Sequence, residues 1–508
     1  MPYLLKGEPW DEALGSTRTL YASDIGFTSE PWDTPANIHW VRRIDGPMVV
    51  ERSLWSGDAI GGYSATDPGS AVLANPDGAL DHWADYEWDG RVVQIWHTDK
   101  EKPVLSDFQL VYNGVADQVV PGDDFEIVLA GLDALLEKPF SRGEFAGSGG
   151  IEGSEDMKGR GRPALLGRRR RFTPVLLDSA AQIYMIDPQG YHAILSADDA
   201  GDPFEVVGPD LASFDALKAL DAGSWDYATS RATGLFRLAT KPHGTITVAA
   251  EGVAPGGTWI SCYADLVRHV ITASVPAGSI EFDDASFAAM AVLCPQVLGY
   301  WHDGSGSLTV RDLVDELSAS VGAHWGGNEA RRLEIGRYDG PAAEPDFVIP
   351  ERHVISITPR EIERRMKSLR LSYRPFDTTI DQKDLVNWEA IPPEVRESLG
   401  EPVRWTARAT HAGAAAASIL AREDEDATLF DAGSDAVEER NRRLALFGPA
   451  ARLFDVEVPL IAGLTAGKTV RLYHHRHGLA EGWNAVVLSA KRERESVHQL
   501  TLMGFRNG

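Results

Sequence analysis

Residues 149–178 read GGIEGSEDMKGRGRPALLGRRRRFTPVLLD, and this stretch decides how the fold of the whole chain is interpreted. Its first half is too rich in glycine and charge to be a core element, yet it leads directly into an apolar segment. We therefore predict a loop over residues 147–171, followed by strands at 173–177 and 182–186. Because glycines and like charges cannot bury apolar surface, we expect the loop to be mobile in the free protein and ordered only against a partner.

Two further phrases stand downstream: ATSRATGLFRL at residues 228–238 and PHGTITV at 242–248. In this order, the stretches between 149 and 248 resemble tail proteins of long-tailed bacteriophages, specifically the hub or tail-tip (baseplate hub-like) protein that closes the end of the tail tube. VISITP at 354–359 and GKTVRL at 467–472 extend the resemblance toward the C-terminus. It begins near residue 91, and the residues before that point match no family.

The resemblance implies a structural virion component with no catalytic residues, no metal and no cofactor. Such a hub is a homotrimer that connects the distal tail protein ring to the central tail fibre. It gates the exit of DNA and of the tape-measure protein during host cell entry. In the fold that it implies, two tube-like β-barrel domains flank a mixed α/β region, so that three copies present six barrels to a six-fold tail tube. The protein would be made in the bacterial host cytoplasm and reside in the virion tail.

Composition indicates a large acidic protein. The chain has 508 residues, with 49 Lys+Arg against 75 Asp+Glu and a formal net charge of −26. This charge favours solubility and opposes specific nucleic-acid binding, because phosphates need a basic surface. We expect no signal peptide and no membrane segment, since no apolar run is long enough. Cys262 and Cys294 are too few for a disulfide framework and are expected to be buried thiols.

Hydrophobic patterning predicts a mainly β protein with a helical middle section (α+β) and several domains. Short β-branched and aromatic runs at 91–98, 108–112 and 125–129 are separated by turn clusters at 113–114 and 121–124, which is typical of a barrel or sandwich. We divide the chain into an N-terminal arm or lead-in (1–50), a first β-barrel domain (51–145), a Gly/Arg-rich loop with an accessory β region (146–248), a mixed helical domain (249–345) and a second β-barrel domain with a helical insertion (346–508).

Helix boundaries are expected at four places. Ser213 is a predicted N-cap for a helix over 213–221, and a second helix carries Leu266, Val267, Val270 and Ile271 on one face. Thr309 with Asp312 resembles a capping box for a helix that ends near Gly322. A long helix is predicted over 435–447, with Asp435 as its cap.

The basic patch is the candidate site for docking a partner. Four consecutive arginines are unfavourable unless something neutralises their charge. Docking to an acidic neighbouring subunit or to passing DNA, and a solvated loop, stay open as alternatives. The candidate residues are Arg160, Arg162, Arg168, Arg169, Arg170 and Arg171.

Two tempting motifs are interpreted as structural. AGLTAGKT at 462–469 matches a loose P-loop, but the segment after Lys468 alternates with period two, which predicts a strand where nucleotide binding needs a helix. His474, His475 and His477 suggest a metal site. However, neighbouring residues on a strand point to opposite faces, and no carboxylate or cysteine is near in sequence. We therefore predict a tight turn and solvated loop histidines.

Two functions of other classes remain as alternatives to the hub. Acidic runs at 198–199 and 423–426 could be paired carboxylates of a tail-associated cell-wall (peptidoglycan or glycan) hydrolase. That chemistry needs two carboxyls facing each other across a cleft, which sequence neighbours do not provide. A receptor-binding adhesin is the other alternative, because the 14 Trp could line a sugar-binding groove as well as a core or an interface. We expect the protein not to be an enzyme.

Overall fold

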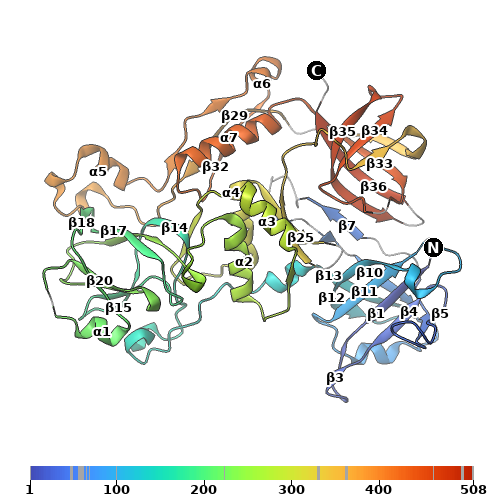
Figure 1. Ribbon diagram of the computed structural model, residues 1–508, viewed down its shortest axis with the longest axis horizontal. Helices are drawn as coiled ribbons and strands as arrows, with labels where there is room; N and C mark the ends of the chain where they lie inside the picture. The colour runs from blue at the N-terminus through green and yellow to red at the C-terminus, as the bar shows by residue number, and fades with distance from the viewer. Residues whose placement is uncertain are drawn as a thin grey trace.

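The computed structural model describes residues 2–45, 50–54, 62–63, 66–67, 69–98, 100–221, 223–328, 332–360, 364–461, 463–493 and 497–505. The chain is mainly β, with 39% strand against 21% helix, arranged in several sheets around a helical middle (Figure 1). This agrees with the predicted class.

The first sheet has eight strands in the order β10-β13-β12-β11-β1-β4-β6-β5. The predicted N-terminal arm contributes to it, because Leu4, Leu5 and Trp40 are buried apolar residues that need a sheet partner. The predicted turn at 113–114 is also wrong, since one long strand runs through it. The strands are β1 (Tyr3–Gly7), β4 (Leu20–Ser23), β5 (Phe27–Thr28), β6 (His39–Arg42), β10 (Ser70–Ala74), β11 (Val92–His97), β12 (Gln109–Val120) and β13 (Asp124–Ala130), with β2 (Trp10–Asp11) and β3 (Ser16–Thr17) in a separate hairpin.

Two five-stranded sheets follow, in the orders β18-β17-β22-β14-β24 and β15-β16-β21-β20-β19. Their cores contain Phe172 stacked on Trp301, with ring centroids 4.2 Å apart. Their elements are β14 (Ala164–Phe172), β15 (Val175–Asp178), β16 (Ile183–Met185), β17 (Ala193–Asp199), β18 (Asp202–Pro203), β19 (Val207–Asp210), β20 (Tyr227–Ser230), β21 (Leu235–Leu238), β22 (Ile246–Glu251), β24 (Gly299–His302) and helix α1 (Phe214–Ala219).

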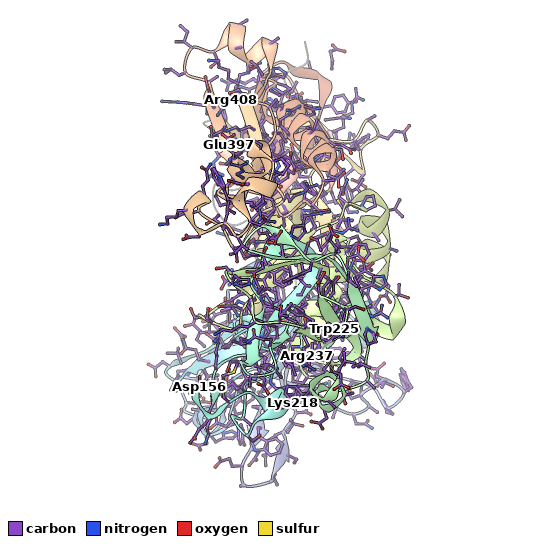
Figure 2. All side chains as sticks on the ribbon, turned by 90° about the vertical axis from the view of Figure 1, so that its left-hand side faces the viewer. Asp156, Lys218, Trp225, Arg237, Glu397 and Arg408 are labelled. Carbon is purple, nitrogen blue, oxygen red and sulfur yellow. The ribbon has the colours of Figure 1, made fainter. Side chains whose placement is uncertain are left out.

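Helix α1 begins as its sequence predicts but ends at Ala219, two residues before the predicted end at 221. The Ser213 hydroxyl accepts a hydrogen bond from the Ala216 amide at 3.2 Å, which confirms the predicted cap. At the other end, Arg237 of β21 donates to the carbonyls of Leu217 and Leu220 at 2.5 and 2.7 Å. Figure 2 shows Arg237 beside Trp225 on this side of the molecule.

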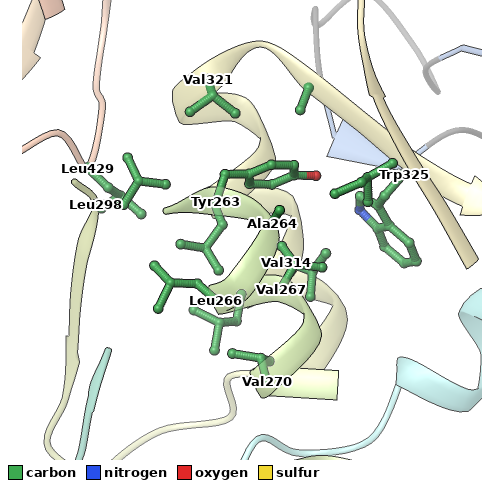
Figure 3. Packing of buried hydrophobic residues seen from close by; sticks show 14 of the residues in the cluster. Tyr263, Ala264, Leu266, Val267, Val270, Leu298, Val314, Val321, Trp325 and Leu429 are labelled. Atoms are coloured by element: carbon green, nitrogen blue, oxygen red, sulfur yellow. The ribbon is translucent and has the colours of Figure 1, made fainter. Parts of the chain in front are cut away.

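The helical middle holds the largest core cluster (Figure 3). Leu266, Val267, Val270 and Ile271 of α2 (Tyr263–Ser274) are fully buried, as the predicted apolar face requires. The phenol of Tyr263 lies 2.8 Å from the hydroxyl of Ser318, which satisfies both buried groups. The other elements are α3 (Asp284–Leu293), α4 (Val310–Val321), β23 (Glu281–Phe282), β25 (Ala323–Gly327), β26 (Arg332–Arg337) and β8 (Gly62–Tyr63).

Helix α4 has the predicted boundaries. Thr309 and Asp312 form a reciprocal capping box, in which the Asp312 amide donates to the Thr309 hydroxyl at 3.0 Å. Gly322 closes the helix in the left-handed conformation at φ 63°, where glycine is favoured.

The cysteines fit the prediction in part: both are free, Cys294 is buried, and Cys262 is half-buried.

The C-terminal part contains a second eight-stranded sheet and a smaller sheet that packs on α7. Strand β7 (Val50–Ser53) pairs with β35, so the chain crosses from the N-terminal part to this sheet. Helix α7 (Gly433–Phe447) begins two residues before the predicted cap Asp435, and its observed cap is Ala432. The elements are β9 (Thr66–Asp67), β27 (Phe347–Ile349), β28 (Ser356–Pro359), β29 (Met366–Tyr373), α5 (Pro393–Leu399), β30 (Arg404–Trp405), β31 (Ala409–Thr410), α6 (Ala412–Ala417), β32 (Arg422–Asp426), β33 (Ala451–Pro459), β34 (Thr469–His474), β35 (Leu479–Glu493) and β36 (Val497–Phe505).

Candidate functional site

The four consecutive arginines belong to a strand, and the predicted loop is wrong for this part of the chain. They occupy the second half of β14, which pairs with β24 over its first residues and with β22 over its last. A strand in the middle of a sheet can carry adjacent cations only if carboxylates from other elements neutralise them. The structure brings those carboxylates in from far along the chain.

Three of the four arginines are neutralised within the chain. Arg168 pairs with Glu251 at 2.5 Å, directly across the β14–β22 register. Arg169, which is buried, holds Asp377 with two hydrogen bonds of 2.7 Å. Arg170 bonds Asp431 at 2.5 and 3.0 Å. The contacts with Asp377 and Asp431 join β14 to residues more than two hundred positions away in sequence, so the arginine strand fastens the middle sheets to the C-terminal part.

Asp431 is the centre of this junction. Its buried carboxylate also receives Arg168 at 3.2 Å and lies 3.7 Å from Arg374. Burial alone would raise the pKa of Asp431, but the hydrogen bonds and charges of Arg170 and Arg168 outweigh it and hold the pKa below the usual value. The carboxylate is therefore ionised and structural at neutral pH.

Arg171 differs from its three neighbours. It donates to the Ser398 carbonyl at 2.7 Å, and its guanidinium carbon lies 4.0 Å from the centroid of the Phe376 ring. Among the residues that the structure describes, no carboxylate oxygen lies within 4 Å of it. Burial lowers its pKa.

The other two candidate arginines lie before β14. Arg162 pairs with Glu152 at 2.5 Å and packs over the ring of Phe145. Arg160 is exposed. The glycine-rich part of the predicted loop contains two short 3-10 turns, at Gly150–Glu152 and Glu155–Met157, with Met157 buried. The predicted role of the six arginines in docking a partner stays a prediction.

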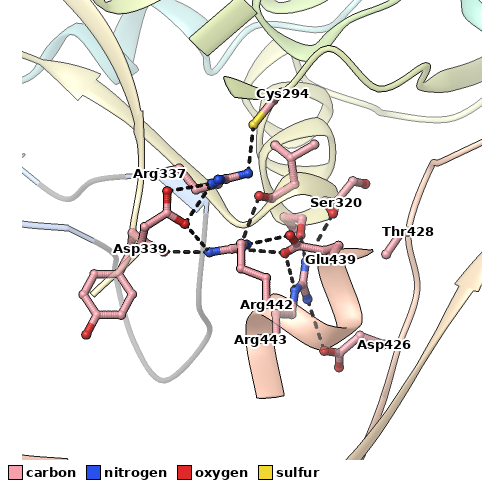
Figure 4. Close-up of polar contacts among 12 residues, drawn as sticks. Cys294, Ser320, Arg337, Asp339, Asp426, Thr428, Glu439, Arg442 and Arg443 are labelled. Carbon is pink, nitrogen blue, oxygen red and sulfur yellow. Dashed lines mark hydrogen bonds and ion pairs between the residues drawn. The ribbon is translucent and has the colours of Figure 1, made fainter. Parts of the chain in front are cut away.

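A second charged junction lies on α7, and no sequence pattern singled it out (Figure 4). Glu439 is buried and accepts from Arg442 and Arg443, each at 2.7 Å. Arg443 also donates to the Ala319 carbonyl at the end of α4, at 2.6 Å. Arg442 reaches Asp339 at 3.0 Å. The i, i+3 and i, i+4 spacing of Glu439, Arg442 and Arg443, the α7 trio, is visible in the sequence. Burial of the trio, however, depends on α4 packing against α7.

The phosphate-loop candidate is a turn, as predicted. Lys468 is followed by β34, so no helix N-terminus is available to a phosphate. Gly467 has a φ of 90°, which suits a tight turn, and Lys468 lies 4.0 Å from Asp346. Ala462, at the start of the motif, is outside the described residues.

The histidine cluster differs from its prediction in one respect. His474 ends β34 at a register shift, and its ring centroid lies 4.5 Å from that of His475, so the two rings do not point to opposite faces. Strand β27 runs parallel to β34. Its register places Glu351, two residues after the end of β27, beside His474 and His475. Ligand atoms of the three residues lie within 4.8 Å of one another. The Glu351 carboxylate and Nδ1 of His475 contact each other directly, and the absence of a metal stays a prediction.

The acidic runs considered for hydrolysis are engaged in structural contacts. In β32, Glu423 pairs with Lys367 at 2.8 Å and Glu425 with Arg370 at 2.6 Å. Asp198 is half-buried in β17 and accepts from the Thr247 hydroxyl at 2.8 Å. Within the described ranges, no helix is both long and apolar enough to cross a membrane.

No protein-family model and no curated protein sequence matches the chain. Several solved structures are similar to it. One is the 43 kDa tail protein of prophage MuSo2 from Shewanella oneidensis, with 10% identity, a TM-score of 0.37, and coverage of 99% of this chain and 98% of that one. Another is a tail protein from Neisseria meningitidis MC58, with 10% identity, a TM-score of 0.39, and coverage of 99% and 96%.

A chain in the virion of a native gene transfer agent particle is also similar, with 14% identity, a TM-score of 0.42, and coverage of 69% of this chain and 85% of that one. The similar chains are therefore tail or virion proteins, the class that the sequence resembles. Because identities are low and TM-scores are below 0.5, these similarities do not assign a function to the chain.

Proposed function

We propose that this chain is a structural component of a phage tail, and specifically the hub that closes the distal end of the tail tube. One observation carries the proposal: two of the segments on which the sequence resemblance rests, 149–178 and 242–248, are joined in one sheet. Strand β14, from 149–178, pairs with β22, which begins in 242–248, with Arg168 opposite Glu251 and Phe172 opposite Val248. The distinctive residues therefore form one structural unit.

The domain division belongs to the same proposal. In this proposal, the first sheet and the C-terminal sheet, each with eight strands, would form the two barrel domains of a hub subunit. Three copies would then present six barrels to a six-fold tube, joining the distal tail protein ring to the central tail fibre. Closed rings let identical subunits cover their exposed sheet edges.

Charge supports a passive channel. With a net charge of −26, the protein repels a DNA backbone, so DNA and the tape-measure protein could pass without adhering. In this proposal the hub has no cofactor, no specific nucleic-acid site and no hydrolase activity. Incubation with purified peptidoglycan should release neither sugar nor peptide. Release of either would favour the wall-degrading alternative.

An adhesin is retained as a second candidate because of one hollow in the first sheet domain. It has a volume of about 530 Å³ and is lined by Trp32, Trp40 and Trp96 together with the polar Asp33 and Gln94. Trp32 is 80% exposed. Aromatic rings beside polar groups can bind a sugar, but they can equally bind a protein.

A binding assay separates the two candidates. The isolated protein is mixed either with purified distal tail protein or with host cells, and bound protein is measured by sedimentation. A hub binds the tail protein and not the cells. Binding to cells alone, lost in Trp32→Ala but not in the control Trp405→Ala, would favour the adhesin.

A further inference from the structure

A small hollow beside the arginine strand has an unusual charge. It has a volume of about 220 Å³ and lies between β14, β17, β22, the segment just after β29 and the segment around β30. Four arginines line it, against a single carboxylate, Asp198. The part of the molecule involved is the side seen in Figure 2, where Glu397 marks α5 above the middle sheets. The lining arginines are Arg170, Arg171, Arg374 and Arg404.

The positive charge in the hollow is only partly balanced. Arg170 is engaged by Asp431, and Arg374 donates to the Asp431 carbonyl at 3.1 Å. Arg404 pairs with Glu401 at 3.0 Å, but that carboxylate is half exposed. Asp198 is half-buried, and burial raises its pKa, which disfavours the charged form. The guanidinium of Arg171 contacts a carbonyl and an aromatic ring, and it interacts with Asp198 and Glu401 only through longer-range electrostatics.

The hollow also brings two like charges together. The guanidinium carbons of Arg171 and Arg404 lie 4.0 and 5.9 Å from the centroid of the same ring, Phe376. Arg404 acts on Arg171 in the same direction as burial, lowering its pKa. Two cations held against one ring repel each other, and an anion between them would remove the repulsion.

Backbone geometry shows that this arrangement is imposed by the fold. Arg171 and Arg374 have φ values of 53° and 49°, in the left-handed region that non-glycine residues seldom adopt. The β14–β22 register also shifts between Arg169 and Phe172, so a bulge interrupts the pairing at Arg171. Bulges redirect side chains and are frequent next to functional sites, and strain of this kind costs of order 1–3 kcal/mol.

We propose that the socket formed by Arg171, Arg374, Arg404 and Phe376 receives a carboxylate side chain from a second copy of this chain. The occupant follows from charge: each copy carries 75 acidic against 49 basic residues, so a neighbouring subunit presents carboxylates almost anywhere on its surface. Contact between two such acidic surfaces needs a cationic recess. This step rests on the proposed ring of subunits, whereas anion binding by the socket does not.

The first experiment tests the socket with a small carboxylate. Thermal melting of the full chain is measured in sodium glutarate and in sodium chloride at equal ionic strength. Glutarate should raise the melting temperature of the wild type by about 1–3 °C and should not raise that of Arg171→Gln or Arg404→Gln. Arg160→Gln, which removes the same charge from an exposed site, should respond like the wild type. An equal response in all four proteins would overturn the socket, and a response to sodium phosphate but not glutarate would overturn its choice of ligand.

The second experiment tests the occupant. Self-association is measured by analytical ultracentrifugation over a range of concentrations. Arg171→Gln and Arg404→Gln should each weaken it about tenfold, while Arg160→Gln should not. A trimer that forms equally well in both socket variants would overturn the second copy as occupant and leave the hub proposal standing. A wild type that stays monomeric would contradict both, even if the socket binds glutarate.

Discussion

At the scale of single residues, the chain handles charge by pairing it inside its own fold. The arginines of β14 pair with carboxylates of other elements, and those of α7 pair with Glu439 of the same helix and with Asp339 and Asp426 outside it. A buried ion pair adds little net stability over apolar packing, but removing one partner leaves an uncompensated charge and is costly. These residues are therefore the places where single substitutions should be most damaging.

Glu439→Gln should lower the stability of the helical part by about 3 kcal/mol, because Arg442 and Arg443 would lose their shared buried carboxylate. In calorimetry this corresponds to a loss of roughly 6–12 °C in the melting temperature of the affected transition. Glu438→Gln is the matched control, since Glu438 is exposed on the same helix. Equal melting of both variants would show that the trio contributes no stability.

His269 should make the protein sensitive to mild acid. Burial and the neighbouring Arg142 lower the pKa of His269 to about 4, whereas an unfolded histidine has a pKa near 6.5. The unfolded state therefore binds more protons between these values, so stability is complete above about pH 6.5 and is lost as pH falls toward 4. The loss between pH 7 and 4.5 should be about 2 kcal/mol.

The variant His269→Gln isolates this effect. Asp187, whose pKa burial raises to about 6, acts in the opposite direction, so the difference between the two proteins is the informative quantity. Melting temperatures of wild type and variant should converge as pH falls from 7 to 4.5. Parallel curves would mean that His269 is not neutral in the fold.

At the scale of elements, local signals in the sequence predicted helix ends better than strand identities. Ser213, Thr309 with Asp312, and Gly322 act through their own nearest backbone groups, so their roles could be predicted without tertiary contacts. The strand β14 could not be predicted, because its four arginines become compatible with a sheet only through Glu251, Asp377 and Asp431. The N-terminal strands likewise depend on pairing with β11, which begins far along the chain.

Thr309→Ala should weaken the start of α4 by about 1 kcal/mol, since the capping box would lose its reciprocal hydrogen bond. The expected result is a decrease of roughly 2–4 °C in melting temperature. Ser307→Ala, in the exposed turn just before, should leave it unchanged. If both substitutions had the same effect, the cap would not account for the helix boundary.

Limited proteolysis tests the arginine strand directly. Trypsin should spare the bonds after Arg168, Arg169 and Arg170 in the folded protein, because these residues pair within a sheet, and should cut first after the exposed Arg160. Cleavage sites can be identified by mass spectrometry. Early cleavage within 168–170 would indicate that these residues lie in an accessible loop, as the sequence alone predicted.

At the scale of the whole molecule, the proposed assembly depends on the contacts between subunits. The eight-stranded sheet at each end of the chain leaves outer strands that an assembly could cover. The strand β7 crosses from the N-terminal part to pair with β35, and Asp431 ties the middle sheets to the C-terminal part. These links join the N-terminal part, the middle sheets and the C-terminal part of one chain.

The proposed trimeric hub is tested by measuring the mass of the assembled protein by light scattering. The same sample is then imaged by electron microscopy. A hub of this kind should give about three times 55.3 kDa, alone at high concentration or with the distal tail ring present, and images should show a three-fold particle with six barrel densities. A stable hexamer, or a particle with one barrel per subunit, would contradict the proposed symmetry.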